Sequence, residues 1–261
     1  GITNISGTLS TIFLPRGSYT LRLTTRDRAN NVAADSISFI ITTPMPTPAE
    51  ILQKVAENFG KIEDMKGTMT SWGNVGTKTF PEVEEIFMMK KPDKVKVISP
   101  AKEEIIIING ELMYYINPTF GTLTMQINEY SNIKPSQLNF YYYSTEFQEK
   151  HEIEIKNHND NFYILEVIPK EPNWNYEKLI LEIDYQKGID IKTEFYIKAT
   201  ETATLGMEIE VKKSQLIDDI WIPTETVKKV FLEEEIVAES NMQLHDIQIN
   251  TGIKDEEFII H

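Results

Sequence analysis

The sequence predicts a mainly β protein of the α+β class, with a strongly curved antiparallel sheet of about 11 strands in a half-open barrel and helices on its concave face. Short segments of alternating apolar and polar residues follow one another from Lys66 onward, as in strands with one buried side. Turn sequences such as Asn109-Gly110 and residues 186–188 separate these segments, which favours hairpins and antiparallel pairing. So many strands must curl or close to protect the edges of their sheet.

A partial immunoglobulin-like β domain is predicted for residues 1–43. Tyr19, Leu21 and Leu23 alternate with polar residues, and a polar turn and a second alternating segment follow. Residues 14–19 resemble the tyrosine corner of immunoglobulin-like sandwiches. Because such a sandwich needs about seven strands and roughly 100 residues, we expect only its C-terminal strands here, and we expect an export signal or anchor to be missing ahead of this sequence.

A proline-rich linker at residues 44–48 is predicted to lead into the main domain, residues 49–261. A helix should begin there, because Thr47 can cap it, Pro48 suits the first helical position and Glu50 completes a capping box. Its apolar residues recur at helical spacing and predict one buried face; they are Ile51, Leu52, Val55, Ala56, Phe59, Ile62 and Met65.

A second helix is predicted around residues 134–148, where an aromatic run, Asn139-Phe-Tyr-Tyr-Tyr-Ser144, attracts attention. One interpretation is a lid whose aromatic side chains cover a bound lipid. The other is a helix that packs on the sheet, as every surface helix needs a buried face.

The composition excludes several classes of protein. The chain carries 40 acidic and 26 basic residues, a net charge of −14, which argues against binding to nucleic acid and to anionic membrane surfaces. It contains no cysteine, so there is no disulfide, thiolate metal site or cysteine nucleophile. No stretch of the sequence reaches the 18 or so apolar residues of a membrane-spanning helix.

No constellation of catalytic residues is recognisable. The four histidines, His151, His158, His245 and His261, show no metal-ligand spacing, and no serine lies in a G-x-S-x-G context. Adjacent carboxylates are frequent, but 40 acidic residues explain them by chance. We therefore expect a non-enzymatic protein with no catalytic residue, no metal and no cofactor.

Four motifs together resemble the outer-membrane lipoprotein-sorting family with the LolA/LolB-like fold. The first is the amphipathic helix at 49–71 that leads into a strand. The second is a phenylalanine followed by basic residues around a proline, here Phe87, Lys90, Lys91, Pro92, Lys94 and Lys96. The third is the aromatic hairpin at 108–118. The fourth, residues 246–258, is similar to the strand, Asn, Gly turn, acidic residue and Phe with which the family ends, so it should be the final barrel strand.

The resemblance covers roughly residues 48–258 and implies an extracytoplasmic carrier, secreted, periplasmic or attached to the cell surface. It implies a cavity for acyl chains and a partner that is a lipid or a lipidated protein, with a cell-envelope protein as a further possible partner. One departure is clear: carriers of the family use a strand arginine to switch the lid, whereas no arginine occurs here after Arg28. Lysine cannot replace a planar group with several donors, so a lid switch of that kind is not expected.

We expect the ligand-binding residues among apolar side chains of alternating strands and of the second helix. They are Phe87, Met89, Met113, Tyr115, Phe140, Tyr143 and Leu165. The alternative is the same fold with a filled core, acting as a cell-surface module that binds or senses a protein. Both demand the same alternation, and only the volume of the cavity separates them.

Overall fold

The computed structural model describes residues 17–26, 29–41, 45–126, 144–159, 161–171, 176–198 and 203–260. The chain divides into two units, Gly1–Pro46 and Thr47–His261, and each is considered by itself.

The described part of the first unit is an antiparallel hairpin of β1 (Gly17–Arg26) and β2 (Val32–Ile41). Tyr19 lies opposite Phe39 with its ring stacked 5.8 Å away. Leu21 faces Ile37 across the same side, as the alternation predicted. The immunoglobulin-like assignment stays a prediction, and the Leu-Pro-Arg part of its tyrosine corner lies outside the described residues.

The main unit is built on one antiparallel sheet of 13 strands, in the order β8-β7-β6-β5-β4-β3-β15-β14-β13-β12-β11-β10-β9. The predicted mainly β, antiparallel class is confirmed, with more strands than the expected 11. The strands of the first half are β3 (Asp64–Val75), β4 (Lys78–Lys90), β5 (Lys94–Ser99), β6 (Glu104–Asn109), β7 (Leu112–Asn117) and β8 (Gly121–Gln126). Those of the second half are β9 (His151–His158), β10 (Phe162–Pro169), β11 (Lys178–Asp184), β12 (Ile189–Lys198), β13 (Ala203–Ile217), β14 (Ile220–Leu232) and β15 (Glu235–Ile249).

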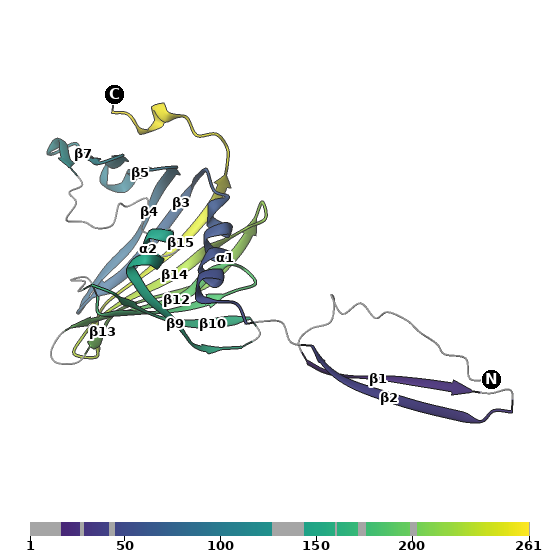
Figure 1. Cartoon of the computed structure of the whole chain (residues 1–261). Coiled ribbons are helices and arrows are strands. Elements are labelled where there is room, and N and C mark those ends of the chain that lie inside the picture. Colours follow the sequence, from purple (N-terminus) through teal and green to yellow (C-terminus); the bar gives the residue numbers. More distant parts are fainter. Residues whose placement is uncertain are drawn as a thin grey trace. The chain divides into compact units, whose positions relative to one another are not determined.

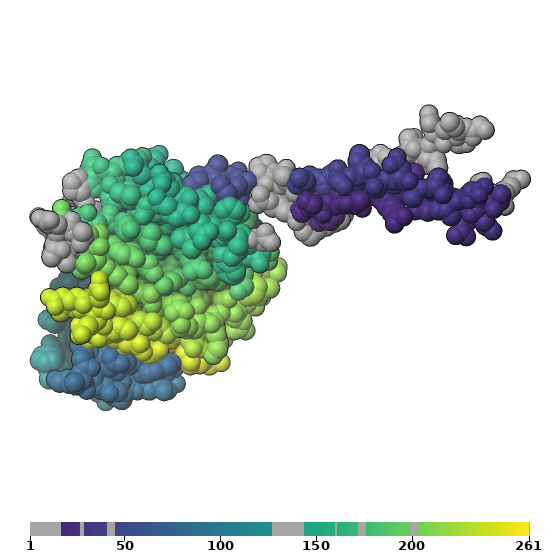
Figure 2. All heavy atoms as spheres, turned by 90° about the horizontal axis from the view of Figure 1, so that it is seen from below, coloured from purple at the N-terminus to yellow at the C-terminus, as the bar shows by residue number. Residues whose placement is uncertain are grey.

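Sequential hairpins build both halves, and the last strand joins them. β15 pairs with β14 on one side and with β3 on the other. Figure 2 shows the result on the surface, where C-terminal atoms (yellow) lie between the first strands (blue) and later ones (green). Within the described residues, β8 and β9 are the two edges, so the sheet is open rather than a closed barrel. The strand directions change strongly from β4 to β10, as Figure 1 shows.

The C-terminal strand ends where the sequence predicted. β15 stops at Ile249, because Asn250 and Gly252 have positive φ angles of 55° and 75° and turn the chain away. It is the last strand of the sheet, as expected, but it occupies an interior position between β14 and β3. The residues that follow form a short 3₁₀ helix, η4 (Asp255–Phe258), instead of strand.

The first helix, α1 (Pro48–Gly60), begins where the capping box predicted. The Thr47 side-chain oxygen accepts from the Glu50 N–H at 3.2 Å, and the Glu50 carboxylate accepts from the Thr47 N–H at 2.7 Å. The helix ends earlier than its apolar spacing suggested: Ile62 follows it, and Met65 already belongs to β3.

The apolar face of α1 packs on the second half of the sheet. Ile51, Leu52 and Val55 are fully buried in one cluster with β-strand side chains, among them Leu181 and Ile189. Figure 1 shows the helix lying across the strands. This apolar contact fixes the helix on the sheet.

A pair of hydrogen bonds and a glycine fix the end of α1 and the turn beside it. Asn58 donates to the Trp221 carbonyl at 2.8 Å and accepts from its N–H at 2.9 Å, which ties α1 to β14. Gly188 has a φ of 65°, and a Cβ there would lie 2.7 Å from the Lys54 carbonyl oxygen, so the β11–β12 turn can approach α1 only as glycine.

The second predicted helix is described only from Ser144 onward. It contains α2 (Thr145–Lys150), capped by the Ser144 hydroxyl, which accepts from the Phe147 N–H at 3.0 Å. Phe147 is fully buried in the same cluster as α1. The aromatic run that was interpreted as a lid, except Ser144, lies outside the described residues.

Candidate functional site

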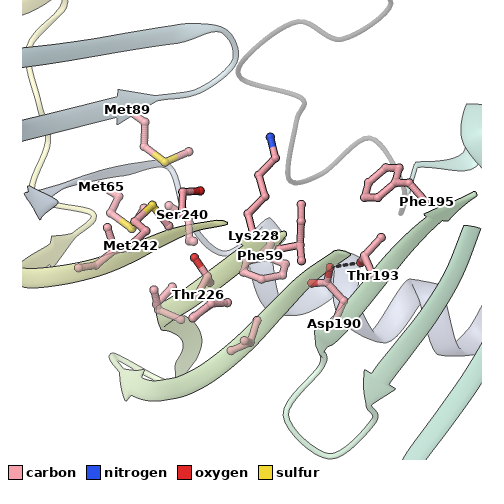
Figure 3. A pocket seen from close by; sticks show the side chains of 16 residues that line it. Phe59, Met65, Met89, Asp190, Thr193, Phe195, Thr226, Lys228, Ser240 and Met242 are labelled. Atoms are coloured by element: carbon pink, nitrogen blue, oxygen red, sulfur yellow. Dashed lines mark hydrogen bonds between the residues drawn. The ribbon is translucent and has the colours of Figure 1, made fainter. Parts of the chain in front are cut away.

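The main unit contains a cavity of about 340 Å³ between the end of α1 and the sheet. Phe59 and Ile62 line it from the helix side, and side chains of β3, β4 and β12 to β15 line the rest. Three methionines, Met65, Met89 and Met242, gather at one side, as Figure 3 shows. Their flexible thioethers can adapt to apolar groups of varied shape.

Few polar groups face this cavity. Asp190 and Lys228 are the two charged residues among the sixteen that line it. The Asp190 carboxylate accepts a hydrogen bond from the Thr193 hydroxyl at 3.3 Å. Thr226 and Ser240 add hydroxyl groups. An apolar space with a small number of polar groups is the usual character of a small-molecule site.

The cavity has a buried end and an open end. Ile222 is 2% exposed, and Thr226 further along β14 is half-buried. Lys228, two residues later, is exposed, and so is Ser240, which lies directly opposite it on β15. The lining therefore changes from buried to exposed along β14, from Ile222 to Lys228.

The residues expected to bind ligand are placed as follows. Met89 lines the cavity. Phe87 is buried next to Gly67, and Leu165 is fully buried in the cluster under α1. Met113 and Tyr115 lie on β7, away from the cavity lining, and the Tyr115 hydroxyl donates to Glu104 at 2.7 Å.

Phe140 and Tyr143 lie outside the described residues. The strand registers relate the other four residues of the first half: Met89 pairs with Val95, and successive partners across the sheet lead to Met113. Alternating residues of the first half thus follow one face of the sheet, as expected, but only the part near α1 lines the cavity.

Sequence reasoning did not identify most of the lining. Asp190, Thr226, Lys228 and Ser240 carried no signal, because polar residues at alternating positions normally indicate a solvent-facing side of a strand. β-bulges also shift the alternation, for example between Phe195 and Tyr196 on β12. Met242 carried no distinguishing signal either, because methionines in strands also fill ordinary cores.

On the other face of β4 to β7, the C-terminal segment is bound by lysines. Lys90 donates to the Ile253 carbonyl at 2.7 Å and forms an ion pair with Asp255, which also pairs with Lys94 at 2.8 Å. Both ammonium groups, Lys90 first, lower the pKa of Asp255 to about 2. Phe258 is 1% exposed in a small cluster with strand side chains. The second and fourth motifs of the sequence therefore meet in space.

Asp64 anchors the beginning of this segment. Its carboxylate is buried and accepts from the N–H groups of Thr251 and Gly252, each at 2.9 Å, and of Ile253 at 3.2 Å. Asp64 is the first residue of β3, so the first strand of the main unit holds the segment that follows its last strand, β15.

His151 is the buried histidine of the described chain. Its Nδ1 lies 2.6 Å from the Phe147 carbonyl oxygen and its Nε2 lies 2.7 Å from the Tyr176 hydroxyl. These partners fit a neutral ring that donates from Nδ1 and accepts at Nε2. Burial lowers the pKa of His151. No group of three or more acidic or histidine side chains in the described ranges is placed to hold a metal ion.

Comparisons with known proteins place the fold. A family model described as an uncharacterized protein matches residues 130–259, and no curated protein matches the chain. A LolA superfamily protein from Nitrosomonas europaea is similar in structure, with a TM-score of 0.58 at 15% identity over 83% of this chain and 99% of its own.

Two further structures are equally similar. A domain from Vibrio parahaemolyticus described as an outer membrane lipoprotein-sorting protein has a TM-score of 0.60 at 17% identity, over 80% of this chain and 95% of its own. A DUF1329 family protein from Desulfovibrio piger has a TM-score of 0.60 at 15% identity, over 84% and 98%. No helix among the described residues is long and apolar enough to span a bilayer. The resemblance first indicated by the four motifs is confirmed at the level of the fold: the main unit has the fold of the LolA superfamily.

Proposed function

We propose that this protein is a non-enzymatic, extracytoplasmic carrier that holds an acyl chain of a lipid or of a lipidated protein in the cavity between α1 and the sheet. The observation that carries the proposal is the cavity of about 340 Å³ with its mainly apolar lining. An apolar space of this size in a core would otherwise cost stability, because its lining loses packing contacts.

The size of the cavity suits one chain. A methylene group takes about the volume of a water molecule, roughly 30 Å³, so about ten methylene groups fill it. At about 0.8 kcal/mol for each buried methylene, the transfer is worth on the order of 8 kcal/mol before the costs of ordering the ligand. A longer chain would extend through the open end past Lys228.

In this proposal α1 and the second helix form the cover of the cavity on the concave side of a half-open barrel. The fold supports it, because two of the similar structures are described as a LolA superfamily protein and a lipoprotein-sorting protein. Ion pairs on the outer face of β12 to β14, such as Lys192 with Glu208, give that face the charged character that suits a carrier in an aqueous compartment.

The experiment is native mass spectrometry of the full chain purified from cell extract, followed by solvent extraction and lipid analysis. A stoichiometric adduct with the mass of an acyl-chain compound is expected. Thr226→Phe should abolish the adduct, because the Thr226 side chain points into the cavity and a phenyl ring would occupy it. Val227→Phe is the matched control, since Val227 is its neighbour on β14 and does not line the cavity.

A protein that carries no adduct and takes up none of a fatty acid, a phospholipid or a lipopeptide would overturn the proposal. The alternative, a module that binds a protein partner through its surface, would then take its place. An adduct that survives Thr226→Phe would show that lipid binds elsewhere.

A further inference from the structure

We propose that Lys228 binds an anionic head group, a carboxylate or a phosphate, of the ligand whose chain occupies the cavity. This inference rests on the proposed function and adds the class of ligand. Lys228 is the single cation among the described lining residues, and Figure 3 shows its side chain extended, with the nitrogen away from β14.

The position of Lys228 matches what an amphiphile requires. The cavity is buried at Ile222, whereas Lys228 is exposed to water at the other end. A head group at the rim keeps part of its hydration while the chain is buried, so the charge need not be fully desolvated. The Ser240 hydroxyl, opposite Lys228 on β15, is a second hydrogen-bond donor at the same rim.

The ammonium group of Lys228 forms no ion pair within the described part of the main unit. No carboxylate there lies within 4.0 Å of its ammonium group. Lys229, the next residue, points to the opposite face, where its ammonium pairs with Glu208 at 3.1 Å. The two lysines are therefore neighbours in the sequence with different roles. Lys229 belongs to an ion-pair network of the outer face, and Lys228 offers a cation to the cavity.

The other charged lining residue does not neutralise this site. Asp190 is bonded to the Thr193 hydroxyl on its own strand, β12. The strand partners that flank Lys228 are Ile209 on β13 and Ser240 on β15, and neither carries a charge. For a protein with a net charge of −14, one cation at the mouth of an apolar cavity is a local exception that would favour an anion over a neutral or cationic head group.

The test compares ligands that share one chain and differ in head group. Dodecanoate, dodecyl phosphate, dodecanol and dodecyltrimethylammonium would be titrated into the full chain by isothermal calorimetry, with wild type, Lys228→Met and Lys229→Met. Methionine keeps the apolar stem and removes the charge. Because Lys228 is exposed, a preference of about three- to tenfold is expected for the anions over dodecanol.

Lys228→Met should remove this preference while leaving the affinity for dodecanol unchanged, and Lys229→Met should retain it. The two anions distinguish the sources: tighter binding of dodecanoate points to a fatty acid, and tighter binding of dodecyl phosphate points to a phospholipid. Equal affinity of the wild type for dodecanol and both anions, or a preference that survives Lys228→Met, would overturn the inference while the carrier function stands. Failure of all four ligands to bind the wild type would overturn the proposed function and the inference together.

Discussion

Asp64 should control whether the C-terminal segment stays on the sheet. Its carboxylate accepts three main-chain N–H bonds from Thr251, Gly252 and Ile253, at 2.9, 2.9 and 3.2 Å, and it is only 4% exposed. Asp64→Asn keeps the size of the side chain but replaces one acceptor oxygen with an NH₂ group. That NH₂ group would face either the N–H of Thr251 or the N–H groups of Gly252 and Ile253. In both orientations a hydrogen-bond donor would face another donor, and the bond would be lost.

The expected loss follows from the kind of bond removed. Hydrogen bonds to a charged group contribute about 1.5–3 kcal/mol, and the variant loses at least one of them together with the charge. A loss of about 2–3 kcal/mol corresponds to roughly 30- to 150-fold at 1.4 kcal/mol per tenfold. Since the segment follows β15 and is not itself a strand of the sheet, it can open locally without unfolding the sheet.

Hydrogen–deuterium exchange of the amides of residues 251–253 measures this opening directly, and exchange should accelerate by that factor in Asp64→Asn. Asp255→Asn is the control on the same segment. It removes ion pairs of a side chain that is 57% exposed, and solvent screens such pairs so that they contribute little to stability. If Asp64→Asn accelerates exchange no more than Asp255→Asn does, the anchoring role of Asp64 is wrong.

Three further predictions concern the packing around α1 and α2. Burial lowers the pKa of His151 below its ordinary 6.5, so the unfolded chain takes up a proton on this ring at a higher pH than the folded chain does. The contribution of the neutral, buried ring to stability is therefore present above pH 6.5 and is lost as the pH falls below that value. The difference between the urea midpoints at pH 7.5 and pH 5.5 should be larger for the wild type than for His151→Phe, and equal differences would contradict this. Asn58→Ala should lower the free energy of unfolding by about 2–3 kcal/mol in urea titrations, since it leaves the N–H and the carbonyl of Trp221 without their partner. Gly188→Ala should cost at least about 2 kcal/mol by the same measurement, because of its positive φ and a carbonyl oxygen of α1 2.7 Å from the new Cβ, whereas Gly60→Ala, with open space around it, should be neutral; equal costs would refute the close-approach argument.

Local features of the sequence predicted local structure well. The start of α1 follows from Thr47, Pro48 and Glu50, whose capping bonds reach no further than three residues. The antiparallel sheet follows from alternation and hairpin turns, since each strand finds its partner next to it in the chain. The order of four motifs was enough to indicate the fold that the similar structures confirm.

What the tertiary structure decided lies in contacts between distant parts of the chain. The interior place of β15 beside β3 could not be read from either strand, because both pair equally well with any neighbour of matching alternation. Lysines of one motif and acidic residues of another meet only after the sheet has formed, as Lys90 and Asp255 do across 165 positions.

The cavity shows most clearly what the sequence determines and what only the tertiary structure decides. The sequence by itself determined that apolar residues alternate along many of the strands, and this alternation is the same for a filled core and for an empty space. Whether side chains from α1 and six strands meet or leave about 340 Å³ between them depends on where the helix lies and where bulges shift the strands. For the same reason, only the folded sheet distinguishes Lys228, at the mouth of that space, from Lys229, which pairs with Glu208 on the opposite face.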